Sequence, residues 1–240
     1  MKITKLLIAM MAAAIVFASC EKDEDEEDVQ PRTRLVKVEI TSSAYNQTDI
    51  YTYNENNQVV EHSYTFEGES STTEKNTTYT YNENGEPVEW EQTGNGYGNG
   101  ITTIEINSDN IVETEPDGDE VTYSLNSDDK ITNSDDGTFQ YNYYYDGDNL
   151  DRKEGLLSYK YEYDLSKDNV IPALGINHWT KSENLVTENW LYNYDEISDK
   201  ALLLDYDFEF NEDGTPATAT LYHDFYSDTE IYVTYTYEEY

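Results

Sequence analysis

Residues 79–85 read Tyr79-Thr80-Tyr81-Asn82-Glu83-Asn84-Gly85, and residues 51–57 repeat the pattern as Tyr-Thr-Tyr-Asn-Glu-Asn-Asn. Alternating aromatic residues place their side chains on one face of an extended strand. The Asn, Asp and Gly residues that follow them tolerate a positive φ and close a tight turn. Each copy is therefore typical of a strand that ends in a hairpin turn and is followed by a returning strand.

Looser copies of this unit recur along the rest of the chain. They share an alternating pair of apolar residues followed by Asn, Asp or Gly, and they begin at Ile104, Tyr123, Tyr143, Tyr161, Tyr192 and Phe208. Eight such turns, with loops too short for parallel crossovers, imply about sixteen antiparallel strands. We therefore predict an all-β fold: an antiparallel meander of successive hairpins that forms an open sheet or a barrel-like sheet, with almost no helix.

The composition indicates an ordered protein in spite of its charge. The 240 residues include 51 Asp and Glu against 14 Lys and Arg, for a net charge of -37. Such a charge is common in disordered chains, but 24 Tyr and 3 Trp are not. Aromatic side chains bury a large area, and tyrosine keeps its polar tip hydrated. We expect an aromatic core, and no nucleic-acid partner, because phosphate binding needs a basic surface.

The N-terminus has the form of a secretory signal peptide. Lys2 and Lys5 precede an apolar run from Leu6 to Phe17, which is too short to span a bilayer, and the sole cysteine, Cys20, follows. The run resembles a bacterial lipoprotein signal. That resemblance implies a signal peptide over residues 1–19, cleavage between Ser19 and Cys20, and a lipid such as palmitate on Cys20. The alternative is an ordinary signal with an incidental cysteine.

An acidic segment separates Cys20 from the first predicted strand. Residues 21–28 contain seven acids and one lysine, and such dense like charge stays solvated. We predict a flexible tether over residues 20–33. The acidic run also resembles the export tag of Bacteroidetes surface lipoproteins, which implies exposure on the outer face of the outer membrane.

The domain that follows covers residues 34–240 and contains one irregular insertion, at 168–187. Pro172 and Gly175 interrupt any strand there, and the segment is longer than a hairpin loop. A short helical turn, a lid, or a plug over one end of the core are the alternatives. In the terminal stretch, Thr234, Thr236 and Glu238 alternate with aromatic residues, so a lipid-facing surface is not expected there. We predict that only the lipid anchor contacts the membrane.

Two resemblances concern the domain as a whole. Tyr81 to Gly85, Tyr145 to Leu150, Tyr163-Asp164 and Phe210 to Gly214 resemble the YD repeat of Rhs-type shells, although the arginine that precedes that repeat is missing. Together with the lipoprotein signal, residues 34–240 resemble a Bacteroidetes family of surface lipoproteins of unknown function. The resemblance implies a porin-like β fold and brings no catalytic residues.

Signatures of chemistry are mostly missing from the sequence. It has no Gly-x-Ser-x-Gly elbow, no His-Glu-x-x-His motif and no phosphate-binding glycine loop. His62, His178 and His223 lie far apart, so we expect surface or strand-face histidines. A carboxylate pair for glycoside hydrolysis cannot be singled out among 51 acids. Calcium is the cation that Asp-rich loops favour, and the candidate ligands are Asp146, Asp148 and Asp151.

Aromatic residues outside the core are the remaining candidates for a binding surface. Trp179, His178 and Trp190 lie in or near the insertion, where rings can stack on a sugar or anchor a protein. We predict a non-catalytic binding or scaffolding module for an extracellular glycan or protein. A carbohydrate-active hydrolase with a carboxylate pair, or a purely structural envelope protein, are the alternatives.

Overall fold

The structure is a computed structural model, and it describes residues 33–95, 98–172, 174–180, 182–193, 196–222 and 230–240. The predicted signal peptide, Ser19, Cys20 and all but the last residue of the predicted tether lie outside the described residues. Side chains are described for these ranges except at residues 178, 179 and 191–203.

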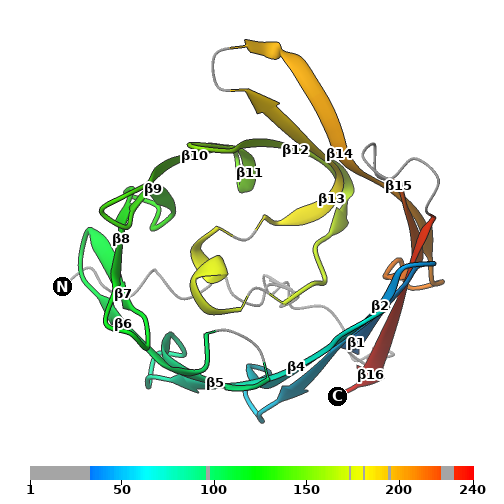
Figure 1. The fold of residues 1–240 in the computed structure, drawn as a ribbon, viewed down its shortest axis with the longest axis horizontal. Coiled ribbons are helices and arrows are strands. Elements are labelled where there is room, and N and C mark those ends of the chain that lie inside the picture. Colours follow the sequence, from blue (N-terminus) through cyan, green and yellow to red (C-terminus); the bar gives the residue numbers. More distant parts are fainter. Residues whose placement is uncertain (1–32, 96–97, 173, 181, 194–195, 223–229) are drawn as a thin grey trace, which may run out of the picture.

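Sixteen strands form one closed antiparallel barrel (Figure 1). They are β1 (Thr33–Thr41), β2 (Tyr45–Tyr53), β3 (Val59–Gly68), β4 (Thr72–Tyr81), β5 (Pro87–Gly94), β6 (Gly100–Ile106), β7 (Asn110–Thr114), β8 (Glu120–Leu125), β9 (Ile131–Asp135), β10 (Gln140–Asp146), β11 (Asn149–Glu154), β12 (Ser158–Asp168), β13 (Asn184–Asn193), β14 (Glu196–Phe210), β15 (Pro216–Tyr222) and β16 (Ile231–Glu239). The predicted all-β meander with almost no helix is confirmed. One 3₁₀ helix, η1 (Gly175–Trp179), lies in the described part of the chain.

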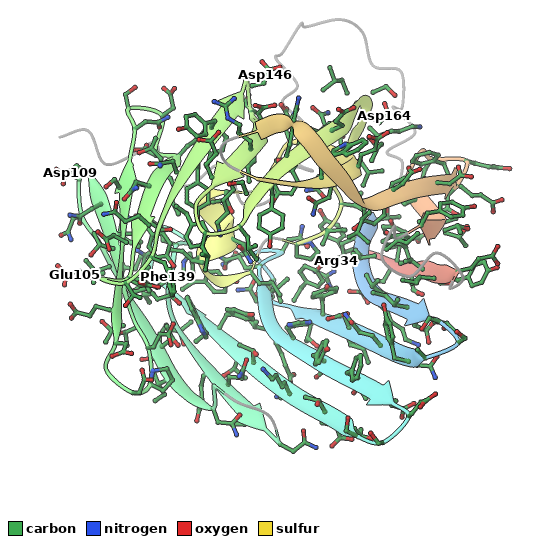
Figure 2. All side chains as sticks on the ribbon, turned by 45° about the horizontal axis from the view of Figure 1, so that its top comes forward. Arg34, Glu105, Asp109, Phe139, Asp146 and Asp164 are labelled. Carbon is green, nitrogen blue, oxygen red and sulfur yellow. The ribbon has the colours of Figure 1, made fainter. Side chains whose placement is uncertain are left out.

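Closure joins the two ends of the meander. β1 pairs with β16 as well as with β2, so that Val38 lies opposite Tyr235 and Ile40 opposite Val233. Arg34 supports this pairing, because its guanidinium forms an ion pair of 2.6 Å with Glu238 and lies over the ring of Tyr53 (Figure 2). The alternative of an open sheet is therefore replaced by a barrel.

The Asn-rich part closes a hairpin in most of the repeated units. The unit at Tyr161 differs from the prediction, because β12 continues past Asp164 to Asp168, and the turn that follows Asn193 lies outside the described residues. In the turn after β4, the Gly85 amide donates to the carbonyl of Asn82, and the Asn82 amide donates to the carbonyl of Glu86. The side chain of Asn82 accepts hydrogen bonds from the amides of Asn84 and Glu86. Gly85 has a φ of 83°. The same pattern, with positive φ at the corresponding position, recurs at Asn57, Gly118, Asp129 and Gly214.

The aromatic part of the unit has a second role. The second tyrosine of the unit donates its hydroxyl hydrogen to a backbone carbonyl of the preceding strand. The four examples are Tyr53 to Leu35, Tyr81 to Val59, Tyr145 to Ile131 and Tyr163 to Leu150. These bonds join neighbouring strands, and at Tyr53, Tyr81 and Tyr145 they lie at the end of the strand that enters the turn.

Alternate residues of the strands face inward, and the apolar core lies on the inner face of the wall. Along β16, Ile231, Val233 and Tyr235 are buried, whereas Tyr232, Thr234 and Thr236 are exposed. Glu105, on the outer face of β6, lies at the periphery of the barrel (Figure 2). The buried residues form two apolar clusters, one centred on β1, β15 and β16 and the other on β6 to β9. Among the described residues, no helix is long and apolar enough to cross a membrane.

Residues 169–183, which we call the interior segment, fold into the barrel and carry η1 (Figure 1). Leu174 packs against the first apolar cluster and Ile176 against the second. Gly175 has a φ of 56°, and a Cβ there would lie 3.4 Å from the Trp90 ring on β5. The irregular part of the chain therefore lies inside the wall and contacts both clusters.

Candidate ligand pocket

A pocket of about 330 Å³ lies between the interior segment and the barrel wall. Its wall comes from β11, β12, β13, β14 and β16, and its other side from the interior segment. The described lining residues are Leu150, Tyr161, Tyr163, Asn169, Ile171, Pro172, Asn177, Thr180, Ser182, Leu185, Val186, Asn189, Tyr206, Phe208 and Tyr235. The volume is at the lower end of the range of about 300–1,000 Å³ that is usual for small-molecule sites.

Aromatic rings form one side of the pocket. The rings of Tyr206 and Phe208 are stacked, with centroids 5.7 Å apart and planes inclined by 8°. The Phe208 ring also lies 6.4 Å from that of Tyr235 on β16. The two residues of β14 face the same way because they are two positions apart in a strand. The pocket therefore offers flat apolar faces from strands that are adjacent only through β15.

Burial keeps the tyrosines of the pocket protonated. Desolvation raises the pKa of Tyr161 and of Tyr206 to about 12. Among the described residues, neither hydroxyl has a hydrogen-bond partner. At neutral pH each hydroxyl can therefore donate a hydrogen bond to a ligand.

Amides supply further polar groups. Asn169, Asn177 and Asn189 all line the pocket. The Oδ1 atom of Asn189 is buried and has no hydrogen-bond partner among the described residues. An unpartnered buried acceptor costs about 1–3 kcal/mol. Asn189 thus leaves an acceptor at the pocket wall that the surrounding protein does not satisfy.

A hydrogen-bonded triad attaches the interior segment to the wall at one end of the pocket. The Tyr163 hydroxyl donates to the carbonyl of Leu150 at 2.5 Å, and the Leu150 amide donates to Ser182 Oγ at 2.9 Å. Ser182 Oγ also lies 2.7 Å from the Tyr163 hydroxyl. Because the tyrosine proton is used by the carbonyl, the serine hydroxyl donates to Tyr163. All three residues line the pocket, so this triad sets its shape.

Hydrogen bonds of asparagines join the two ends of the interior segment and attach the start of β13 to β11. Asn149 and Asn184 form a reciprocal pair, in which Asn149 Nδ2 donates to Asn184 Oδ1 at 2.9 Å and the Asn184 amide donates to Asn149 Oδ1 at 3.0 Å. The Asn169 amide donates to the carbonyl of Glu183 at 2.8 Å. The two ends of the segment therefore lie side by side, and the chain enters and leaves the barrel interior at the same place.

Of the three residues of the predicted ligand surface, only Trp190 has a described side chain, and it does not line the pocket. Trp190 is half-buried on β13, its Nε1 donates to Glu188 Oε2 at 2.9 Å, and its neighbour Asn189 is the residue that lines the pocket. The backbone of His178 and Trp179 belongs to η1, but their side chains lie outside the described residues.

Two of the candidate calcium ligands form ion pairs with basic residues. Asp148 forms an ion pair of 2.8 Å with Lys130, and Asp151 one of 3.2 Å with Arg152. Asp146 lies at the end of β10 (Figure 2). Over the described ranges, no group of three His, Cys, Asp or Glu side chains is placed to hold a metal ion.

Of the three histidines, only His62 has a described side chain. His62 lies on the inner face of β3, where Nε2 is 2.8 Å from Asp49 Oδ1 and the ring stacks on Tyr51. His223 lies outside the described residues. His62 is therefore a strand-face histidine, as expected.

No protein-family model matches the sequence, and no curated protein matches it. Among solved structures, a porin-like protein from Bacteroides uniformis is similar, with a TM-score of 0.57 and 15% sequence identity over 85% of this chain and 98% of the other. A porin-like protein from Bacteroides vulgatus matches with a TM-score of 0.39 and 11% identity over 85% of this chain and 99% of that one. The first of these structures shares the fold of this chain, which is therefore porin-like in the arrangement of its strands.

Proposed function

We propose that the chain is a lipid-anchored outer-membrane protein, exposed on the cell surface, that binds a sugar unit of an extracellular glycan in the pocket inside its barrel. The observation that supports this proposal is the combination of stacked rings and unpartnered polar groups in one pocket. Tyr206 and Phe208 offer flat faces on which a sugar ring can stack. Tyr161 and Asn189 offer a hydroxyl donor and an amide acceptor for its hydroxyl groups.

The polarity of the wall supports anchoring by lipid. A membrane-spanning barrel turns apolar residues to the lipid and polar residues to its interior. The apolar clusters here lie on the inner face, and Thr103 and Glu105 of β6 face outward with Ile101, so the outer face of this strand is not a continuous apolar band. A lipid on Cys20 is the attachment that such a wall allows, and the acidic residues 21–28 would carry the barrel away from the bilayer.

The pocket is better suited to binding than to hydrolysis. Glycoside hydrolysis needs two carboxyl groups that flank the bond to be broken. None of the described residues that line the pocket is Asp or Glu. A structural envelope protein, the other alternative, would have no use for an open pocket with unsatisfied polar groups.

Binding to a glycan array tests the proposal. The chain with Cys20→Ala, which lacks the lipid, would be compared with the same chain carrying Phe208→Leu, which removes one flat face and keeps apolar bulk. Phe66→Leu is the matched control, because Phe66 stacks on Tyr45 outside the pocket. We expect Phe208→Leu to weaken glycan binding about tenfold or more and Phe66→Leu to leave it unchanged. Absence of any bound glycan, or equal losses in the two variants, would refute the proposal.

A further inference from the structure

One end of the pocket is lined by hydroxyl groups whose hydrogen atoms are already used. Ser182 Oγ accepts a hydrogen bond from the Leu150 amide and donates one to the Tyr163 hydroxyl, which in turn donates to the Leu150 carbonyl. Val186 lies opposite Tyr163 in the pair β12–β13, and Leu185 precedes it. All five residues line the pocket, and we call them its closed end.

The closed end is also apolar. Leu150 and Leu185 are both buried. The residues before them, Asn149 and Asn184, are joined by reciprocal hydrogen bonds, so the two leucines belong to the same part of the wall. A ligand hydroxyl placed here would lose its water and find no donor, and burial of a polar group without its partners is unfavourable. A methyl group has no such requirement.

Other polar groups of the pocket are free to bind a ligand. Among the described residues, the hydroxyl groups of Tyr161 and Tyr206 and the side-chain amide of Asn177 have no hydrogen-bond partner. Tyr161 lies two residues before Tyr163 on the same face of β12. The pocket therefore has an apolar closed end and, beside it, groups that can bind hydroxyls.

The described lining of the pocket carries no charge. None of the described lining residues is Asp, Glu, Lys, Arg or His. A charged ligand would lose its hydration there without gaining a counter-ion, which is costly. The net charge of -37 opposes an anion further. The lining therefore favours a neutral ligand.

We propose that the sugar bound in this pocket is a neutral 6-deoxyhexose, whose methyl group at C6 contacts the closed end and whose ring hydroxyls bind the free polar groups. The inference rests on the proposed function, because the pocket must first accept a sugar. An ordinary hexose has a hydroxyl on C6 that would find no donor at the closed end. An N-acetyl group also ends in a methyl, but its carbonyl needs a donor that the closed end does not have.

Calorimetric titration of the chain with Cys20→Ala tests the preference for a methyl group. The probes are three pairs of methyl glycosides, each pair in one enantiomeric series and differing only by the hydroxyl on C6: fucoside and galactoside, quinovoside and glucoside, rhamnoside and mannoside. Methyl N-acetylglucosaminide and methyl glucuronide complete the set. Val186→Thr adds a hydroxyl to the closed end with little change of shape. Val121→Thr is the matched control, because Val121 packs against the second apolar cluster and does not line the pocket.

We expect the 6-deoxy member of at least one pair to bind about tenfold tighter than its partner, because an apolar pocket discriminates a single added group by about that factor or more. Val186→Thr should bring the two members of that pair within about threefold of each other, since its hydroxyl can bind the hydroxyl on C6. Val121→Thr should leave the ratio unchanged. Circular dichroism verifies that each variant is folded, and the comparison of probes on the unsubstituted pocket does not depend on the variants.

Three results would overturn the inference while the pocket stands. They are equal or tighter binding of the 6-hydroxy member in every pair that binds, tighter binding of the N-acetyl or charged probe than of every 6-deoxy sugar, and a preference that Val186→Thr leaves unchanged. If no monosaccharide binds, the glycans retained on the array decide: terminal 6-deoxy sugars support the inference, and their absence overturns it. Absence of any bound glycan overturns the proposed function itself.

Discussion

The hydroxyl group of Tyr163 lies 2.5 Å from the backbone carbonyl oxygen of Leu150 and donates a hydrogen bond to it across the pair β11–β12. Three other copies of the repeated unit make the same bond to the preceding strand. The Tyr163 hydroxyl also accepts a hydrogen bond from Ser182 Oγ, which belongs to the interior segment. A single tyrosine hydroxyl thus links the wall, the pocket and the segment inside the barrel.

Tyr163→Phe should destabilise the barrel. It leaves a buried carbonyl without its partner at a cost of about 1–3 kcal/mol. For a chain of this size, each kcal/mol lowers the Tm by about 2–4 °C. The control is Tyr222→Phe, because Tyr222 is exposed at the end of β15. Thermal melts that show equal Tm values for the two variants would contradict the assigned role.

Gly175 should tolerate alanine but not leucine. Its φ of 56° makes any side chain strained, and the Trp90 ring lies just beyond the position of a Cβ. Gly147 is the matched control, because its φ is 59° and nothing lies within 4 Å of its Cβ position. We expect alanine to cost about 1–2 kcal/mol at both sites and leucine to cost distinctly more at Gly175 alone. Denaturant unfolding measures the four values, and a similar cost of leucine at the two sites would exclude close packing against Trp90.

High pH should unfold the protein through its buried tyrosines. The pKa of Tyr161 and of Tyr206 is about 12 in the fold and about 10 in an unfolded chain. Because the folded pKa is the higher one, their contribution is complete below pH 10 and is lost as the pH rises from about 10 to about 12. Circular dichroism and tyrosinate absorbance should change together over that window. Tyr206→Phe should lessen the loss, whereas Tyr222→Phe should not.

Cys20→Ala should release the protein from the membrane. The signal-like run before Cys20 and the position of the apolar clusters on the inner face of the barrel both make a lipid on this residue the expected attachment. Cell fractionation and labelling with a fatty-acid analogue measure the effect. A variant that still sediments with membranes would show that another part of the chain holds it there.

Replacement of residues 23–28 by Ala and Ser should keep the lipid anchor but leave the protein on the periplasmic face of the outer membrane. A spacer needs only flexibility, so the density of acids at 21–28 is better explained by recognition during export. We expect protease to digest the wild-type protein on intact cells and to spare the variant. Protection of the wild type itself on intact cells, with digestion after lysis, would place the protein in the periplasm.

The repeated units made the strands and turns predictable from sequence. Tyr79 to Gly85 contains the alternation, the turn residues and the glycine of positive φ in seven consecutive positions, so short-range physics suffices. Closure was not predictable in this way. It depends on whether β1 meets β16, and Val38 and Tyr235 are too far apart in sequence for any local pattern to relate them.

The pocket could not be predicted either, because it too depends on contacts between residues that are distant in sequence. The alternating pattern of ordinary core strands is all that the sequence shows at Tyr206, Phe208 and Tyr235. Only closure of the barrel places these residues around the interior segment. Trp190 is a large ring near the insertion, which predicts a ligand surface, whereas it is the neighbouring amide of Asn189 that lines the pocket. Pro172 and Gly175 mark an interruption of the strands, but they do not reveal whether the segment turns inward or outward.

The pairing of β1 with β16 has a consequence for how the protein is made. Every other strand pair joins strands that are consecutive in the chain and can form as synthesis proceeds. The β1–β16 pair can form only after residues 231–239 have been synthesised. Until then the sheet has two unpaired edges, which can recruit strands from other chains. Bringing together segments so distant in sequence is also slow. A chain that loses its last strand would therefore have intact hairpins and a strong tendency to aggregate.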